Sequence, residues 1–257
     1  MKQIKLHSFI KGLTLVEVLI GVVIGTLTVS AVYYSYNVFS VNFDSMLTKS
    51  QINRDLRFAL NSISRDIRNA GYQSTLPSVG DYQHSPYPTM KYKLILRKNT
   101  YFNMNSLPGV YASGGNDVLE LIYDIDRSTR IRVSYAQLNN GFLAKRVARC
   151  ITANCYHENY EEDKKHYNYN EEGYYNYSNL GMNVISGFKV QLFDKNGAKT
   201  SDVSKTVLVR VSLMMWGEKN IYKTNVTRTF VLEDLIQKYT DLRFRDLITV
   251  VIHPRNL

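Results

Sequence analysis

Residues 11–21 read KGLTLVEVLIG and place one acidic residue, Glu17, at the start of a long apolar segment. The next charged residue is Asp44, so 26 consecutive uncharged residues follow Glu17. The apolar run Leu13–Phe43 contains 31 residues, more than the ~20 that a bilayer span requires. As a helix it would be about 46 Å long. A carboxylate at the edge of a bilayer core costs a few kcal/mol unless it is paired or reaches the interface. Glu17 therefore indicates a function.

The first twelve residues, MKQIKLHSFIKG, contain three lysines and no acid. A basic segment before an apolar run is typical of an export signal and keeps the N-terminus in the cytoplasm, so the rest of the chain faces outward. A secretory signal has a shorter apolar region, with small residues after it. Here Gly12 precedes the run. A plain membrane anchor with Glu17 at the headgroups is an alternative, but it does not explain Lys-Gly directly before the run.

The motif KGLTLVEVLIG resembles the class III signal of type IV pilins and type II secretion pseudopilins. The resemblance implies that prepilin peptidase cleaves between Gly12 and Leu13 and methylates the new N-terminus. Most members carry Phe at the first mature position, where this chain has Leu13. Cleavage creates a cationic amine on Leu13 at membrane depth. Glu17 of a neighbouring subunit can pair with this amine and fix the axial register between helices.

Gly21 and Gly25 are spaced i to i+4 within the apolar run. This pattern lets a second helix approach closely. The alternative is ordinary glycine usage in a transmembrane helix.

The segment after Phe43 contains no proline up to Gly71. Its apolar residues recur at steps of three and four and predict one helical stripe: Ile52, Leu56, Ala59, Leu60, Ile63, Ile67 and Ala70. Gly71 stands at a plausible C′ position. We therefore predict a single helix over residues 13–70, about 87 Å long, in a helical domain 13–71 that spans the membrane at about residues 13–43. The second half should pack its stripe onto a globular domain.

The stretch RFALNSISRDIRNAGY (57–72) resembles the signature of the PilW class of minor type IV pilins. This resemblance implies a minor pilin that primes or caps a pilus fibre, with other minor and major pilins as partners. It also implies an inner-membrane location with a periplasmic globular domain, followed by incorporation into a fibre at the cell surface. A J-type type II secretion pseudopilin is an alternative. The Arg-Asp pairs of the stretch are also typical of a solvated helix face with weak ion pairs.

Beyond Gly71 the apolar period changes from 3.6 to 2, which predicts strands. Residues 117–125, 130–136 and 142–148 should form an antiparallel meander with a turn at Asn140-Gly141. Five further strands are predicted: 93–97, 188–193, 206–216, 226–232 and 247–252. The alternation predicts that one face is buried and the other, with Arg130, Arg132 and Ser134, is wet. The expected fold class is α+β, a long helix packed on a mainly antiparallel β domain over residues 72–257.

Residues 155–180 are rich in Tyr, Asn and Glu and show no period. They predict a surface insertion, either a solvated variable loop or a contact loop. Cys150 and Cys155 would lie in an oxidising compartment, where a disulfide closing so short a loop contributes roughly 2 kcal/mol. A zinc site built from them with His157 and His166 matches no zinc module.

No catalytic or cofactor-binding motif is present in the sequence, so neither an enzyme nor a cofactor is expected. Removing the three leader lysines lowers the Lys and Arg count from 32 to 29 against 22 acids, a net charge of about +7. A fibre-tip module that binds DNA or host surfaces is therefore an alternative. Arg228-Thr229-Phe230 and Arg243-Phe244-Arg245 could contact phosphates and bases. Ordinary solvated strand faces would explain the same runs.

Overall fold

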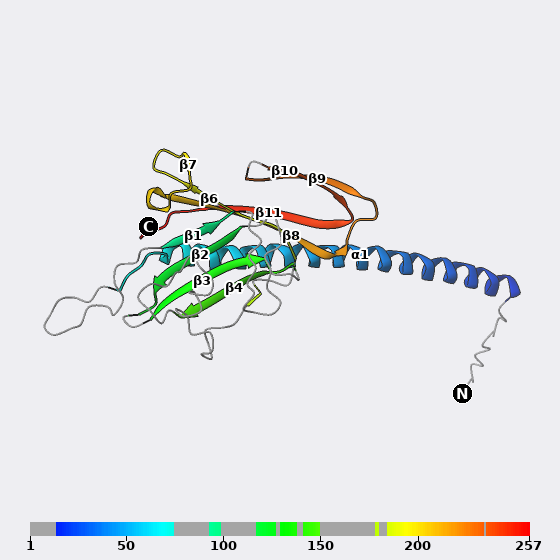
Figure 1. Cartoon of the computed structure of the whole chain (residues 1–257). Coiled ribbons are helices and arrows are strands. Elements are labelled where there is room, and N and C mark those ends of the chain that lie inside the picture. Colours follow the sequence, from blue (N-terminus) through cyan, green and yellow to red (C-terminus); the bar gives the residue numbers. More distant parts are fainter. Residues whose placement is uncertain are drawn as a thin grey trace, which may run out of the picture. The chain divides into compact units, whose positions relative to one another are not determined.

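The computed structural model describes residues 14–74, 93–98, 117–126, 129–137, 141–149, 178–179, 184–233 and 235–257. The chain divides into two compact units, Met1–Leu47 and Thr48–Leu257. The described part of the first unit is the N-terminal portion of one helix, α1 (Leu15–Asn69). The second unit contains the rest of α1 and all the strands among the described residues (Figure 1).

Helix α1 ends at a glycine, as its sequence predicts. Gly71 has φ 78°, the left-handed conformation of a C′ residue, and its N–H donates to the carbonyl oxygen of Ile122 over 2.9 Å. A Cβ at this position would collide with the carbonyl oxygen of Asn256. Glycine therefore serves both the backbone turn and the close packing of the C-terminal segment.

The first sheet has five antiparallel strands in the order β1-β2-β3-β4-β5. They are β1 (Leu94–Arg97), β2 (Val118–Asp124), β3 (Arg130–Gln137), β4 (Leu143–Arg149) and β5 (Ser178–Asn179). Strands β2, β3 and β4 are the predicted meander, with Val133 opposite both Leu121 and Val147.

The second sheet has four antiparallel strands in the order β11-β8-β6-β7. They are β6 (Val184–Phe193), β7 (Lys199–Thr200), β8 (Leu208–Asn220) and β11 (Arg243–Ile252), with a short 3₁₀ helix, η1 (Val203–Lys205), before β8. A turn follows Phe193 at the end of β6: Asp194 N–H donates to Ala198 O over 2.9 Å, and Gly197 has φ 77°. Strand β11 stands at the edge of this sheet.

A separate hairpin pairs β9 (Val226–Leu232) with β10 (Leu235–Asp241). The sequence analysis predicted β9 but missed β10, because LIQKYTD has too few apolar residues to show a buried alternation. Glu233 adopts φ 57° at the tip of the hairpin.

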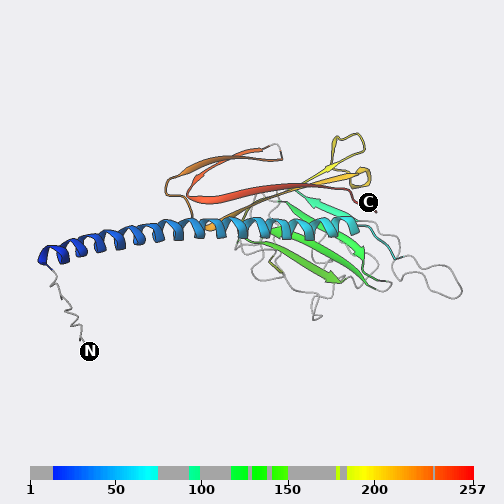
Figure 2. The same cartoon turned by 180° about the vertical axis from the view of Figure 1, so that it is seen from behind.

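One hydrophobic core joins α1 to both sheets, and all seven residues of the predicted helix stripe are buried in it. Their partners include Leu121 and Val133 of the first sheet and Phe188 and Val211 of the second. Figure 2 shows this part of α1 running alongside the sheets. The α+β fold, a long helix packed on antiparallel β-sheets, is confirmed.

The prediction of one buried and one wet face is wrong for β2 and β3. Every residue of both strands is buried, including Arg130, Arg132 and Ser134. The two arginines tolerate burial because each has a carboxylate partner. Arg130 Nε lies 2.7 Å from Asp124 Oδ1, and Arg132 Nη2 lies 2.6 Å from Glu120 Oε1.

Several predictions fall outside the described residues. They concern the leader 1–12 with the cleavage site Gly12-Leu13, Asn140 of the hairpin turn, the Cys150–Cys155 disulfide, and the 155–180 insertion apart from Ser178 and Asn179.

Candidate functional site

The apolar part of α1 is exposed on all sides within the first unit. Every described residue from Thr14 to Phe39 is exposed, with Leu15 at 81% and Tyr34 at 71%. Among the described residues, α1 is the one helix long and apolar enough to cross a membrane. An apolar surface of this extent requires lipid or other helices around it.

Glu17 lies in the first turn of this helix and forms a capping box with Thr14. Thr14 N–H donates to Glu17 Oε2 over 2.9 Å, and Glu17 N–H donates to Thr14 Oγ1 over 3.3 Å. The Thr14 hydroxyl also lies 3.0 Å from the same Oε2 atom. This arrangement satisfies two backbone N–H groups that a helix start leaves unpaired.

The capping box gives Glu17 a second role that the sequence analysis missed, although Thr-x-x-Glu is its sequence signature. Both contacts with Thr14 use Oε2 of the carboxylate. Oε1 makes no hydrogen bond within the part of the chain that the structure describes. Capping therefore orients the carboxylate and leaves one oxygen available for another partner.

The polar and small residues of the apolar segment suit close contact with other helices. Nothing lies within 4 Å of a Cβ built on Gly21 or Gly25, so both present open backbone. Four residues of the segment donate their side-chain hydroxyl to a backbone carbonyl oxygen of the preceding turn. They are Thr26, Thr28, Ser30 and Ser35. These bonds satisfy the hydroxyls without water.

Asp66, in the second unit, links α1 to three strands. It is 1% exposed and accepts hydrogen bonds from the hydroxyls of Tyr123 (β2, 3.2 Å) and Tyr135 (β3). It also pairs with Lys145 of β4. The interpretation of Arg65-Asp66 as a weak pair on a solvated face is therefore wrong for Asp66. Burial, together with the negative charge of Asp66, raises the pKa of both tyrosines.

The arginine-aromatic runs meet one another around the β9–β10 hairpin and β11. The guanidinium of Arg243 lies 3.8 Å from the ring centre of Trp216, and that of Arg245 lies 4.0 Å from Tyr239. Arg228 lies 4.7 Å from the ring of Tyr222. Each of these guanidinium groups therefore lies against an aromatic ring of the protein itself.

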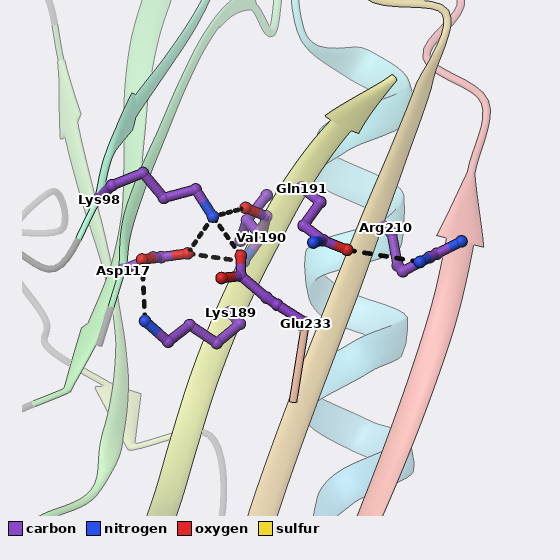
Figure 3. A network of polar contacts seen from close by, with 7 residues as sticks. All are labelled: Lys98, Asp117, Lys189, Val190, Gln191, Arg210 and Glu233. Carbon is purple, nitrogen blue, oxygen red and sulfur yellow. Dashed lines mark hydrogen bonds and ion pairs between the residues drawn. The ribbon is translucent and has the colours of Figure 1, made fainter. Parts of the chain in front are cut away.

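A second polar network, shown in Figure 3, holds the hairpin tip. The Lys98 ammonium lies 2.9 Å from Asp117 Oδ2 and also contacts Glu233 and the carbonyl oxygen of Val190. Lys189 Nζ lies 3.6 Å from the other oxygen of Asp117. The network joins the residue after β1, the residue before β2, strand β6 and the β9–β10 tip. Because its members lie far apart in the chain, no local sequence pattern predicts it.

No protein-family model matches the chain, and no curated protein matches it. Among solved structures, a type IV-like pilin from Thermus thermophilus aligns with it at 10% sequence identity and a TM-score of 0.47. The alignment covers 80% of this chain and 96% of that protein. We draw no functional conclusion from a likeness of this size.

Proposed function

We propose that this chain is a minor type IV pilin, a structural subunit that helps to prime or cap a pilus fibre. The observation that carries this proposal is the apolar, fully exposed first part of α1 with a single carboxylate, Glu17, in its first turn. A helix of this kind needs other apolar surfaces around it, and both lipid and a fibre core provide them.

Processing starts at the leader. Prepilin peptidase removes residues 1–12 by cutting between Gly12 and Leu13, and it methylates the amine of Leu13. Before assembly, α1 holds the protein in the inner membrane with its N-terminus cytoplasmic and its β-rich part periplasmic. Later the subunit enters a fibre at the cell surface together with other minor and major pilins.

The chemical basis of assembly is a pairing of charges inside the fibre. The Leu13 amine is a cation in an apolar environment, where an unpaired charge is costly. Glu17 of an adjacent subunit neutralises it, and the available Oε1 atom is suited to this contact. Because Thr14 holds the other oxygen, the carboxylate is oriented before the neighbour arrives. Gly21 and Gly25 allow the two helices to approach closely.

N-terminal mass spectrometry of protein extracted from membranes tests the processing step. The expected product begins at an N-methylated Leu13. A functional protein that retains Met1 and the leader lysines would contradict the proposal, because the Leu13 amine would never form.

A type II secretion pseudopilin of the J type is the alternative that shares the same leader and helix. Recovery of the protein in fibres sheared from the cell surface supports the pilus. Recovery only in the envelope, together with loss of protein secretion when the chain is deleted, would support the pseudopilin.

Binding of DNA or host surfaces at a fibre tip is a further alternative. For DNA, the guanidinium groups of Arg228, Arg243 and Arg245 already contact the protein's own rings, so stacking on bases would compete with these contacts. DNA retention by the full-length protein in detergent at ~50 mM salt, where phosphate contacts are strongest, is the discriminating measurement.

A further inference from the structure

The part of α1 in the second unit separates its charges between two faces. Asp55 and Asp66 are buried, whereas Arg54, Arg65 and Arg68 are exposed. The side chains of Arg54 and Arg65 are 67% and 70% exposed. In the sequence Asp55 and Asp66 each directly follow an arginine, so the segment shows no block of like charge. In the fold the outer face of the helix is cationic.

Two of these arginines line a groove between α1 and the edge strand β11, with a volume of about 560 Å³. We call it the α1–β11 groove. Its lining includes Ser64, Arg65 and Arg68 from the helix, and Val251, Ile252 and Arg255 from β11 and the segment after it. Both views of the fold show β11 running beside this part of α1 (Figures 1 and 2).

The groove is positively charged, and no carboxylate is among the described residues that line it. Arg68 and Arg255 have no hydrogen-bond or ion-pair partner in the part of the chain that the structure describes. Arg65 Nε lies 3.5 Å from Asp66 Oδ1, but that aspartate is already satisfied by Lys145 and two tyrosines. Three guanidinium groups are therefore available to an anionic partner.

The other wall of the groove is formed by β11, the edge strand of a sheet. β11 pairs with β8 on one side, and no described strand pairs with its other side. An edge strand presents unpaired N–H and C=O groups that can accept an added strand. Val251 is 56% exposed, so an apolar contact is available beside the backbone groups.

We propose that the α1–β11 groove binds an extended acidic segment of a protein partner. The segment adds to β11 as a further antiparallel or parallel strand, and its carboxylates meet Arg65, Arg68 and Arg255. An extended peptide uses both walls of the groove. A nucleic acid would use the arginines and leave the strand edge unpaired, which is why we favour the peptide. This inference does not depend on the proposed role in a pilus.

The test uses the full-length protein in detergent micelles and a fluorescein-labelled peptide of about ten residues that alternates Glu and Val, so that all Glu side chains lie on one face. A second peptide has the same sequence with every backbone nitrogen methylated, so that neither of its edges can donate an N–H to β11. It keeps every charge but cannot form the strand ladder. Fluorescence anisotropy at ~50 mM salt measures the affinity of the protein for each peptide.

We expect the unmodified peptide to bind and the methylated peptide to bind at least about tenfold more weakly, since tenfold corresponds to only ~1.4 kcal/mol. The double variant Arg65→Gln/Arg68→Gln should also bind the unmodified peptide about tenfold or more weakly. The matched control Arg54→Gln, on the same helix but outside the groove, should change affinity less than about twofold.

Three results would overturn the proposal. The first is no binding of the unmodified peptide. The second is equal binding of the two peptides, which would leave only non-specific charge attraction. The third is binding of a single-stranded DNA oligonucleotide that the double variant abolishes while peptide affinity stays unchanged, which would assign the groove to nucleic acid. The comparison of the two peptides needs no variant and so remains decisive if a variant misfolds.

Discussion

Thr14 and Glu17 hold each other at the start of α1, with Thr14 N–H donating to Glu17 Oε2 over 2.9 Å and Glu17 N–H donating to Thr14 Oγ1 over 3.3 Å. Thr14→Ala removes the hydroxyl that accepts from Glu17 N–H, and it keeps the carboxylate together with its bond from the residue-14 N–H. Loss of such a cap costs about 1 kcal/mol of helix stability. We therefore expect fraying of the first turn, measured by amide hydrogen exchange, with fibre incorporation reduced by less than about tenfold. Complete loss of incorporation would show that the cap itself is essential.

Replacement of Asp66 by Asn should destabilise the second unit strongly. The change leaves the Lys145 cation largely buried without its charged partner, and breaking a buried ion pair in this way costs about 3–5 kcal/mol. Urea unfolding of the protein in detergent measures the effect. Arg65→Gln is the matched control, because the Arg65 side chain is exposed and its loss should change stability by less than about 1 kcal/mol. Equal effects of the two changes would contradict the anchoring role of Asp66.

The buried tyrosines predict a loss of stability at alkaline pH. Burial and the Asp66 charge raise the pKa of Tyr123 and Tyr135 above the ordinary value near 10. Below that ordinary value both tyrosines are protonated in the folded and unfolded states, so their contribution is fully present. Above it the unfolded chain ionises first, and stability falls as pH rises towards the folded-state pKa.

Tyr135→Phe removes one of these ionisations. Above about pH 10 the free energy of unfolding of the variant should fall less steeply than that of the natural chain, by up to ~1.4 kcal/mol per pH unit. Urea unfolding between about pH 8 and 11 measures both slopes. Identical slopes would show that Tyr135 does not retain its proton in the fold.

Two glycines with the same backbone conformation should respond differently to alanine. Gly197 has φ 77° and open space around its missing Cβ, so Gly197→Ala should cost only the strain of that conformation, about 1–2 kcal/mol. Gly71→Ala has the same strain and also collides with the Asn256 carbonyl. It should cost roughly 1–3 kcal/mol more. Thermal unfolding, monitored by circular dichroism, compares the stabilities of the two variants. Equal melting temperatures would contradict the packing of the C-terminal segment against Gly71.

The sequence predicted those elements whose pattern is local. The stripe from Ile52 to Ala70 has a strict helical period, and β2, β3 and β9 alternate or end in recognisable turns. The period could not reveal that the polar face of β3 is buried, because Arg130 and Arg132 are stabilised by carboxylates on another strand. Alternation reports that the two faces differ and does not report whether the polar face meets water.

The candidate functional site was predictable only where it depends on a local sequence pattern. Glu17 is conspicuous because it is the single charge at the head of an apolar run. The roles of Asp66 and Glu233 depend on partners from other strands, including Lys145 and Lys98. The cationic face of α1 was hidden because Arg65 and Asp66 are adjacent in sequence, whereas in the fold one is exposed and the other is buried.

The variant Glu17→Gln tests the central claim most directly, because Gln can still complete the capping box but carries no charge. Incorporation of the variant into sheared fibres, relative to its amount in the membrane, is the quantity to measure. If Glu17 neutralises the Leu13 amine of a neighbour, membrane levels should be unchanged and incorporation should fall at least about tenfold, as for Glu17→Ala. Normal incorporation of Glu17→Gln would contradict the account and would leave Glu17 as a helix cap alone.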